Sequence, residues 1–176
     1  MVIKMSENRV DPTVAGLFMT AFIALVFGLL GFELYQGLDW GLFFVADILA
    51  AVIGIVFFVL TVSAIRCGNA FAASLFAFVG VALVAVPICL MVSWFAFVLL
   101  AIFFILFAVI AFIIGAPKLL AIMLIFIGLL YLFVGLYTSP NSEEIFAILF
   151  GLFGVLGGAL ALYLGFALST EKLPVF

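Results

Sequence analysis

The chain has 176 residues, of which 72% are hydrophobic and 7% charged, with no histidine and a net charge of −3. A water-soluble fold is excluded because a chain of this length cannot hide so much apolar surface, so the composition predicts an all-α integral membrane protein. The excess of acidic residues gives no indication of a nucleic-acid partner.

Polar residues dominate positions 1–11, which we interpret as a cytoplasmic segment without the apolar core of a signal peptide. Dividing the rest at charges, prolines and glycine clusters predicts six transmembrane helices in one domain, 12–168, at 12–35, 41–65, 70–91, 95–114, 118–137 and 144–168. The remaining residues, 169–176, form a short cytoplasmic tail. We therefore expect a multi-pass protein of the cell (plasma or inner) membrane with both termini cytoplasmic. This orientation places every basic residue inside, as the positive-inside rule requires: Lys4, Arg9, Arg66, Lys118 and Lys172.

The first helix has a well-formed start. Asp11 is a good N-cap, Pro12 suits the first helical position, and Thr13 can also cap. The unpaired N–H groups and the positive end of the helix dipole then point toward the cytoplasm, where they suit an anion. The alternative is a start signal without any ligand.

Small residues recur at helical spacing in three of the predicted helices. The rows are Gly16, Thr20, Ala24 and Gly28; Ala46, Ala50 and Gly54; and Gly151, Gly154, Gly158 and Gly165. Such rows allow another helix backbone to approach closely, so we expect helix packing, with a close-walled pore as a compatible second role.

Polar groups inside the predicted helices are scarce. No Lys, Arg or His lies in the interior of a span, so an anion would meet only hydroxyls, backbone N–H groups and aromatic edges. Asp47 is the exception and a candidate for proton coupling; alternatively, its helix begins near Ile48 and Asp47 is an interfacial cap. Pro87 removes one hydrogen bond and displaces the carbonyl of Leu83, which predicts a kink. With neither a nucleophile beside a base nor a cluster of metal ligands, we expect no enzymatic activity, cofactor or metal.

Three stretches resemble one family of membrane proteins. The segment "DPTVAGL", residues 11–17, resembles the Asn-Pro-Ala-Pro-Leu-Gly-Leu signature that opens the first helix of the acetate uptake transporter family. The segment "GNAF", residues 68–71, followed by Phe76 and Gly80, resembles that family's Gly-Asn-Thr-Phe entry to the third helix. The segment "GLFGVLGGALALYL", residues 151–164, resembles its glycine-rich sixth helix.

This resemblance implies a homohexamer in which each subunit transports acetate and similar small monocarboxylates, passively or by proton symport. The substrate-binding residues it suggests are Asp11, Pro12, Thr13, Gly16, Leu17, Thr20 and Ser74. The constriction it suggests consists of Thr20, Val79, Ile127 and Ala161. Two aromatic gates of the family are absent from these positions, which predicts a wider and drier neck. Asp11 replaces an asparagine of the family and would repel an anion unless it is capping the helix or protonated.

Two other functions are compatible with the sequence. A channel for small neutral solutes, such as water or ammonia, also fits a neck without charge. A membrane scaffold or stress protein that transports nothing would instead have a continuous packed core without a cavity.

Overall fold

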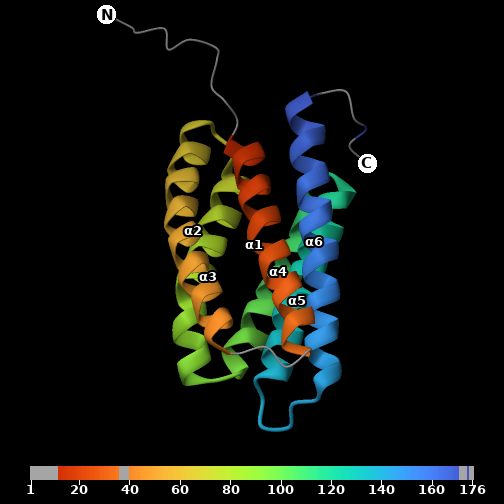
Figure 1. Cartoon of the computed structure of the whole chain (residues 1–176). Coiled ribbons are helices and arrows are strands. Elements are labelled where there is room, and N and C mark those ends of the chain that lie inside the picture. The colour runs from red at the N-terminus through yellow and green to blue at the C-terminus, as the bar shows by residue number, and fades with distance from the viewer. Residues whose placement is uncertain (1–11, 36–39, 171–173, 175–176) are drawn as a thin grey trace, which may run out of the picture.

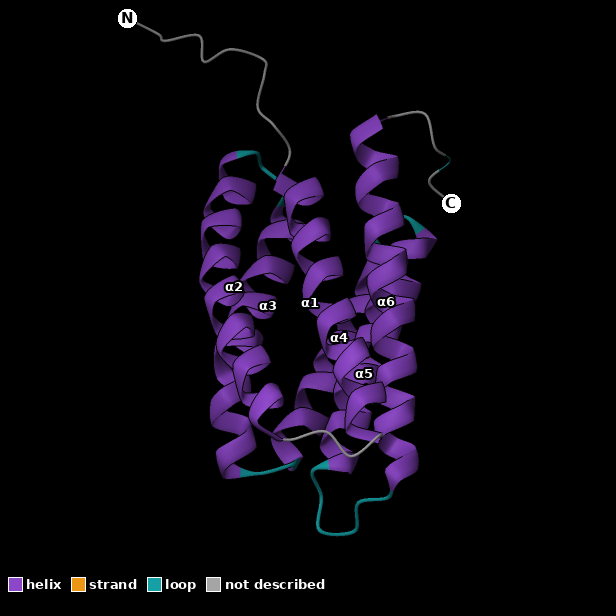
Figure 2. Cartoon of the chain, in the orientation of Figure 1, coloured by secondary structure: helices purple, strands orange, loops and turns teal. Residues whose placement is uncertain are grey.

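The computed structural model describes residues 12–35, 40–170 and 174, with side chains at all of these positions except 35, 40, 42–44 and 88–92. Its regular elements are six helices (Figures 1 and 2): α1 (Pro12–Tyr35), α2 (Trp40–Arg66), α3 (Ala70–Val92), α4 (Phe95–Ile113), α5 (Lys118–Tyr137) and α6 (Glu144–Thr170). Each contains a segment long and apolar enough to cross a membrane. The predicted all-α fold is confirmed. The bounds of α1 and α5 are those predicted, and the other helices differ by one or two residues at an end.

Glycines with positive φ end two of the helices. Gly68 follows α2 with φ of 75°, and Gly115 follows α4 with φ of 73°. After Gly68, the backbone N–H of Asn69 donates to the carbonyl of Ala64 at 3.0 Å, and an equivalent bond closes the end of α4. This C-cap pattern needs a left-handed residue that glycine adopts without steric cost. It turns the chain within a few residues, so consecutive helices run antiparallel.

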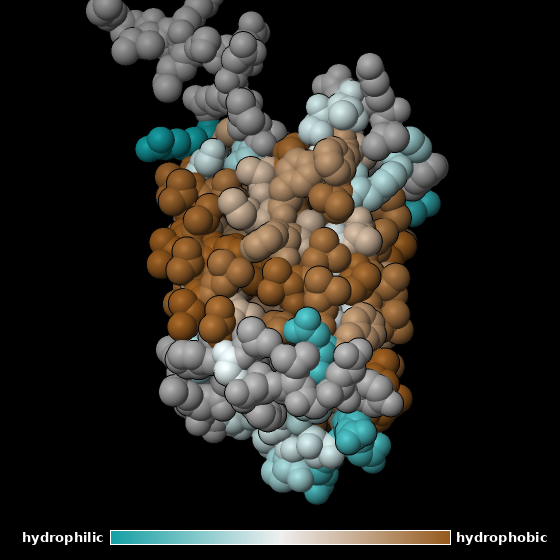
Figure 3. Space-filling model, in the orientation of Figure 1, coloured by the Kyte–Doolittle hydropathy of each residue, from teal (hydrophilic) through white to brown (hydrophobic). Residues whose placement is uncertain are grey.

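The two ends of the bundle carry opposite charge. Arg66 ends α2 and Lys118 begins α5 at the end where α1 starts and α6 finishes, which we call the basic end (Figure 1). Glu33, Glu143 and Glu144 lie at the opposite, acidic end. Figure 3 shows an apolar belt between polar residues at both ends. The start of α1 and the end of α6 therefore lie on the same side of the bundle. That this side is cytoplasmic stays a prediction.

The closest helix contact joins α1 to α6 through glycines. A Cβ on Gly28 would lie 2.6 Å from the backbone nitrogen of Val155, and a Cβ on Gly31 would lie 2.6 Å from that of Gly151. No side chain fits between two backbones at this distance. The predicted packing role of the small-residue rows in α1 and α6 is confirmed.

A second glycine contact joins α2 to α3, where a Cβ on Gly54 would lie 2.9 Å from the carbonyl oxygen of Gly80. Between α3 and α4, in contrast, phenylalanine rings hold the backbones apart. The ring of Phe78 contacts those of Phe104 and Phe107 at centroid distances of 5.0 and 5.2 Å. The boundary between α3 and α4 is thus filled by rings, and we call it the seam.

Candidate functional site

A cavity of about 290 Å³, which we call the vestibule, begins at the basic end and extends into the bundle. Five helices line it, α2 being the exception, together with the α4–α5 link. Among its described lining residues the polar side chains are Thr13, Thr20 and Asn69, and none is Lys, Arg, His, Asp or Glu. The vestibule is therefore an apolar chamber with a few hydrogen-bonding groups.

A smaller cavity of about 30 Å³, the inner chamber, lies deeper along α1. Its lining extends to Phe27 on α1, Leu83 on α3 and Tyr131 on α5. A volume of this size holds about one water molecule. Both cavities are bordered by the same three residues, so they lie in series with a common neck formed by Thr20, Phe104 and Ile127.

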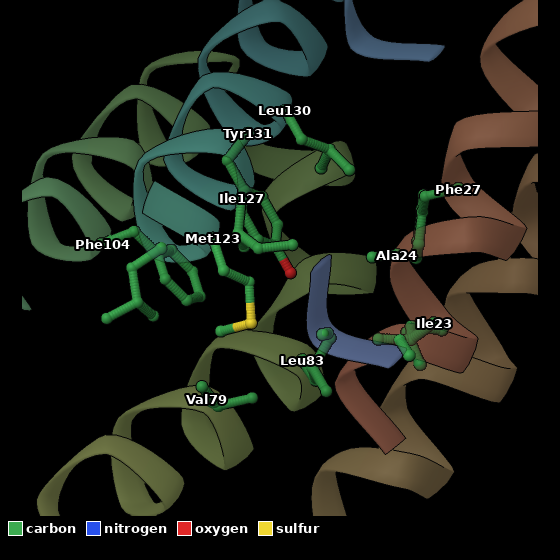
Figure 4. Packing of buried hydrophobic residues seen from close by; sticks show 14 of the residues in the cluster. Ile23, Ala24, Phe27, Val79, Leu83, Phe104, Met123, Ile127, Leu130 and Tyr131 are labelled. Atoms are coloured by element: carbon green, nitrogen blue, oxygen red, sulfur yellow. The ribbon is translucent and has the colours of Figure 1, made fainter. Parts of the chain in front are cut away.

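Aromatic rings from α4 and α5 stack where the neck opens into the inner chamber, Phe104 in the neck and Tyr131 in the chamber. The rings of Phe104 and Tyr131 stack with centroids 5.3 Å apart and planes 8° from parallel. In Figure 4, Tyr131 points from α5 toward α1 and α3, with its hydroxyl oxygen among apolar side chains. Neither residue was predicted. Tyr131 had a detectable signal, a polar-tipped ring in the middle of an apolar helix, whereas Phe104 is one of 24 phenylalanines.

The opposite wall is formed by α1. The hydroxyl of Thr20 donates to the carbonyl of Gly16 at 2.8 Å, so the hydroxyl oxygen remains able only to accept from a solute. Gly16 lies directly against the ring of Phe76 on α3, and a Cβ at this position would overlap that ring. A larger residue at position 16 would therefore push Phe76 out of its place in the vestibule wall.

Asn69 supplies the amide of the vestibule. Its Oδ1 accepts from the backbone N–H of Ala72 at 3.0 Å, which caps α3. Because this bond uses the amide oxygen, the NH₂ group is what Asn69 can offer to a solute. Asn69 is half-buried, so water can also reach it.

The predicted substrate-binding residues are only partly gathered in the vestibule. Four residues of α1 line it: Thr13, Gly16, Leu17 and Thr20. Pro12 is buried at the start of α1 but lines neither cavity, and Asp11 lies outside the described residues. Ser74 requires a correction. It is exposed on the outward face of α3, where its hydroxyl donates to the carbonyl of Ala70 at 3.0 Å, so it cannot offer that hydroxyl inside the cavity.

The predicted constriction residues have three different positions. Thr20 and Ile127 lie in the neck, and Val79 lines the inner chamber. Ala161 is wholly buried and lines neither cavity. Helix α6 contributes Leu164 and Leu168 to the vestibule but no residue to the inner chamber.

Asp47 is not an interfacial cap. Helix α2 begins at Trp40, and Asp47 lies seven residues further on with no exposed surface. That alternative is therefore wrong, because a cap must lie at a helix end beside water. Asp47 lines neither cavity, and both of its carboxyl oxygens lack a hydrogen-bond partner.

Comparison with known proteins finds no matching family model, no matching curated protein and no matching solved structure. The fold and cavities define a class only: a six-helix, multi-pass membrane protein with an apolar vestibule that leads to a neck. The resemblance to acetate uptake transporters stays a prediction.

Proposed function

We propose that the protein provides a membrane pathway for acetate and similar small monocarboxylic acids, which pass its neck uncharged. The observation that carries this proposal is the series arrangement of the vestibule and the inner chamber along α1, with a common neck and no charged residue among their described lining residues. The resemblance of the α1 signature to acetate uptake transporters points to the same substrates.

Desolvation favours the neutral acid over its anion. An ionised carboxylate that enters apolar surroundings without a partner costs several kcal/mol more than the neutral acid. The neck offers no cation to compensate this cost, and Thr20 presents only an acceptor, which suits the O–H of a protonated acid. Each acid molecule would thus carry one proton with it.

The polar groups of the vestibule fit the same substrate. The NH₂ group of Asn69 can donate to a carboxyl oxygen near the rim, and Thr20 can accept from the acid O–H at the neck. The intervening wall is apolar and suits the methyl group of acetate. One donor and one acceptor beside an apolar wall suit a short, uncharged monocarboxylic acid.

A channel for small neutral solutes is the second candidate. The inner chamber of about 30 Å³ favours it, because that volume admits water or ammonia without rearrangement, whereas acetate requires the neck to widen. A scaffold without transport would have no cavity, so the vestibule counts against that alternative.

The test is uptake of labelled acetate into proteoliposomes, compared with protein-free liposomes because acetic acid crosses lipid by itself. Thr20→Phe fills the neck. Ala15→Phe is the matched control, because Ala15 is exposed on the outer face of the same helix. Size-exclusion profiles establish that both variants fold.

We expect saturable uptake that increases as the pH falls, is competed by unlabelled propionate, is lost in Thr20→Phe and is retained in Ala15→Phe. Uptake equal to that of protein-free liposomes would refute the acid pathway. Stopped-flow swelling then tests the second candidate, the neutral-solute channel. Permeability to water or ammonia that is blocked in Thr20→Phe and retained in Ala15→Phe would indicate such a channel. Native mass spectrometry of the same sample tests the homohexamer.

A further inference from the structure

Phe78 of α3 lies in the seam among three rings of α4. Its ring centroid is 5.5, 5.0 and 5.2 Å from those of Phe103, Phe104 and Phe107. Phe103 is exposed on the outer surface of the bundle, and Phe78 itself is half-buried. Phe78 lines neither the vestibule nor the inner chamber, whereas Phe104 lines both. Phe78 therefore meets Phe104 from the outer side of the bundle, and the cavities border Phe104 from the inner side.

The backbone at Phe104 is fixed by the close approach of α5. A Cβ on Gly128 of α5 would lie 3.2 Å from the carbonyl oxygen of Ala101 and 3.4 Å from the Cβ of Phe104. Because α4 and α5 pack closely at this level, the place of the Phe104 ring depends mainly on its two side-chain torsions. The first of these torsions has three staggered positions, and the second is broad.

Two rings restrict those torsions from different sides. Tyr131 of α5 stacks on Phe104 with centroids 5.3 Å apart and planes 8° from parallel, as the labelled pair in Figure 4 shows. Phe78 meets Phe104 nearly at right angles, with planes 70° apart. Both arrangements are favourable for aromatic pairs. Loss of the Phe78 ring would therefore open space on the outer side, into which the ring of Phe104 can turn away from the neck.

We propose that Phe78 sets the width of the neck, although it lines neither cavity, by holding the ring of Phe104 beside the pathway. Phe78 is thus a positioning residue that determines the largest solute able to pass. In the native chain this limit admits acids of the size of acetate and propionate and excludes acids that carry a ring, such as benzoate. The limit on acids rests on the proposed function, whereas the effect of Phe78 on the neck does not.

A purely structural role of Phe78 would be to pack α3 against α4. Phe103 separates the two roles, because its ring also contacts Phe78 across the seam and lines neither cavity. Phe78→Leu and Phe103→Leu each remove one ring from the seam, but only Phe78→Leu removes the ring that holds Phe104. A structural role predicts similar behaviour of the two variants, and a positioning role predicts a wider neck in Phe78→Leu alone.

The first test measures passage through the neck without acetate uptake. Ala24 lines the inner chamber and is buried, so Ala24→Cys places a thiol beyond the neck. The native cysteines, Cys67 and Cys89, are replaced with serine. Mass spectrometry follows the reaction of this thiol with methyl methanethiosulfonate and with the larger benzyl methanethiosulfonate. Thr20→Phe in the same background should slow both reactions, and undiminished rates overturn the proposal because the reagents then avoid the neck.

We expect the ratio of the benzyl rate to the methyl rate to increase about two- to tenfold in Phe78→Leu, since the energy of one aromatic pair corresponds to that change in the population of the displaced ring. Phe78→Met also lacks a ring, and it is the second variant in which the ratio should increase. Phe103→Leu should keep the native ratio. Size-exclusion profiles establish that the variants fold. A native ratio in the folded Phe78 variants, or an equal increase in Phe103→Leu, overturns the proposal.

The second test asks whether Phe78 acts through Phe104. The Phe104→Ala variant already lacks the ring that Phe78 holds. Adding Phe78→Leu to it should therefore leave the ratio at the value of Phe104→Ala alone, because the two substitutions act on one contact. A further increase as large as that in the native background overturns the positioning role.

The third test applies the size limit to the acids. Benzoate should compete with acetate uptake by Phe78→Leu but not by the native chain or Phe103→Leu. Uptake by Phe78→Leu without this competition overturns the size limit. Absence of acetate uptake, together with a raised labelling ratio in Phe78→Leu, would refute the proposed function alone. An unchanged labelling ratio with intact acetate uptake would refute this inference alone.

Discussion

Replacing Gly28 with alanine perturbs the tightest helix contact in the molecule. The new Cβ would lie 2.6 Å from the backbone nitrogen of Val155 and 2.9 Å from the carbonyl carbon of Gly154. Both are backbone atoms of α6, which cannot rotate out of the way as a side chain can. The helices must therefore part by about 1 Å to reach an ordinary contact distance of about 3.5 Å.

The cost follows from that displacement. A gap of 0.5–1 Å removes about a quarter to a half of the dispersion energy of each contact along the interface. Overpacking in cores costs about 1–3 kcal/mol, and we expect Gly28→Ala at the upper part of this range because backbone meets backbone. Gly154→Ala acts on the same contact, since its Cβ would lie 2.6 Å from the Cα of Gly28. The double variant should cost less than the two single costs together, because the first substitution already parts the helices.

The assay is unfolding by increasing mole fractions of dodecyl sulfate in mixed micelles, followed by circular dichroism. Gly165→Ala on α6 is the matched control. The nearest atoms to its Cβ would belong to the ring of Phe18, at 3.1 Å, and a half-buried ring can shift. Its stability should be unchanged or about 1 kcal/mol higher, because alanine is the better helix former. Equal stabilities for Gly28→Ala and Gly165→Ala would refute the backbone contact.

Three other predictions follow from the cavities and the helix ends. Asn69→Ala removes the cap of α3 and should cost about 1 kcal/mol, whereas Asn69→Ser should retain most of it; equal losses would argue against the cap. Phe104→Ala widens the neck, so benzoate should compete with acetate uptake by this variant but not by the native chain, and equal competition in both would argue against a neck at Phe104. Cys67, half-buried after α2 at the basic end, should react with a membrane-impermeant maleimide in inside-out vesicles only, in a Cys89→Ser background. Labelling from the outside would reverse the predicted orientation.

The helix bounds were predictable because their signals are local. Charges, glycines and prolines mark the links, and the apolar runs between them have the length of a membrane span. The predicted end of α6 was two residues short, because Ser169 and Thr170 continue the helix by donating their hydroxyls to the carbonyl of Phe166. Polarity alone indicates a tail at these residues, whereas the helix satisfies them internally.

The neck was only partly predictable for a different reason. Thr20 and Ile127 were suggested by resemblance, but Phe104 in the neck and Tyr131 in the inner chamber lie on helices that are apolar all round. In a soluble protein, the buried face of a helix is apolar and the solvent-exposed face is polar. Here lipid and protein interior both accept phenylalanine, so the sequence of α4 carries little information on which face lines the cavity.

If the proposed function holds, the packing of the bundle indicates which wall of the neck would move to admit a solute larger than the inner chamber. On α1 the wall is held by backbone contact with α6, and parting these helices costs the most packing. On α3 the wall meets α4 through rings, such as Phe78 against Phe104, each pair worth about 0.5–1.5 kcal/mol and able to slide or rotate. Displacement of α3 along α4 thus costs less packing than separation of α1 from α6.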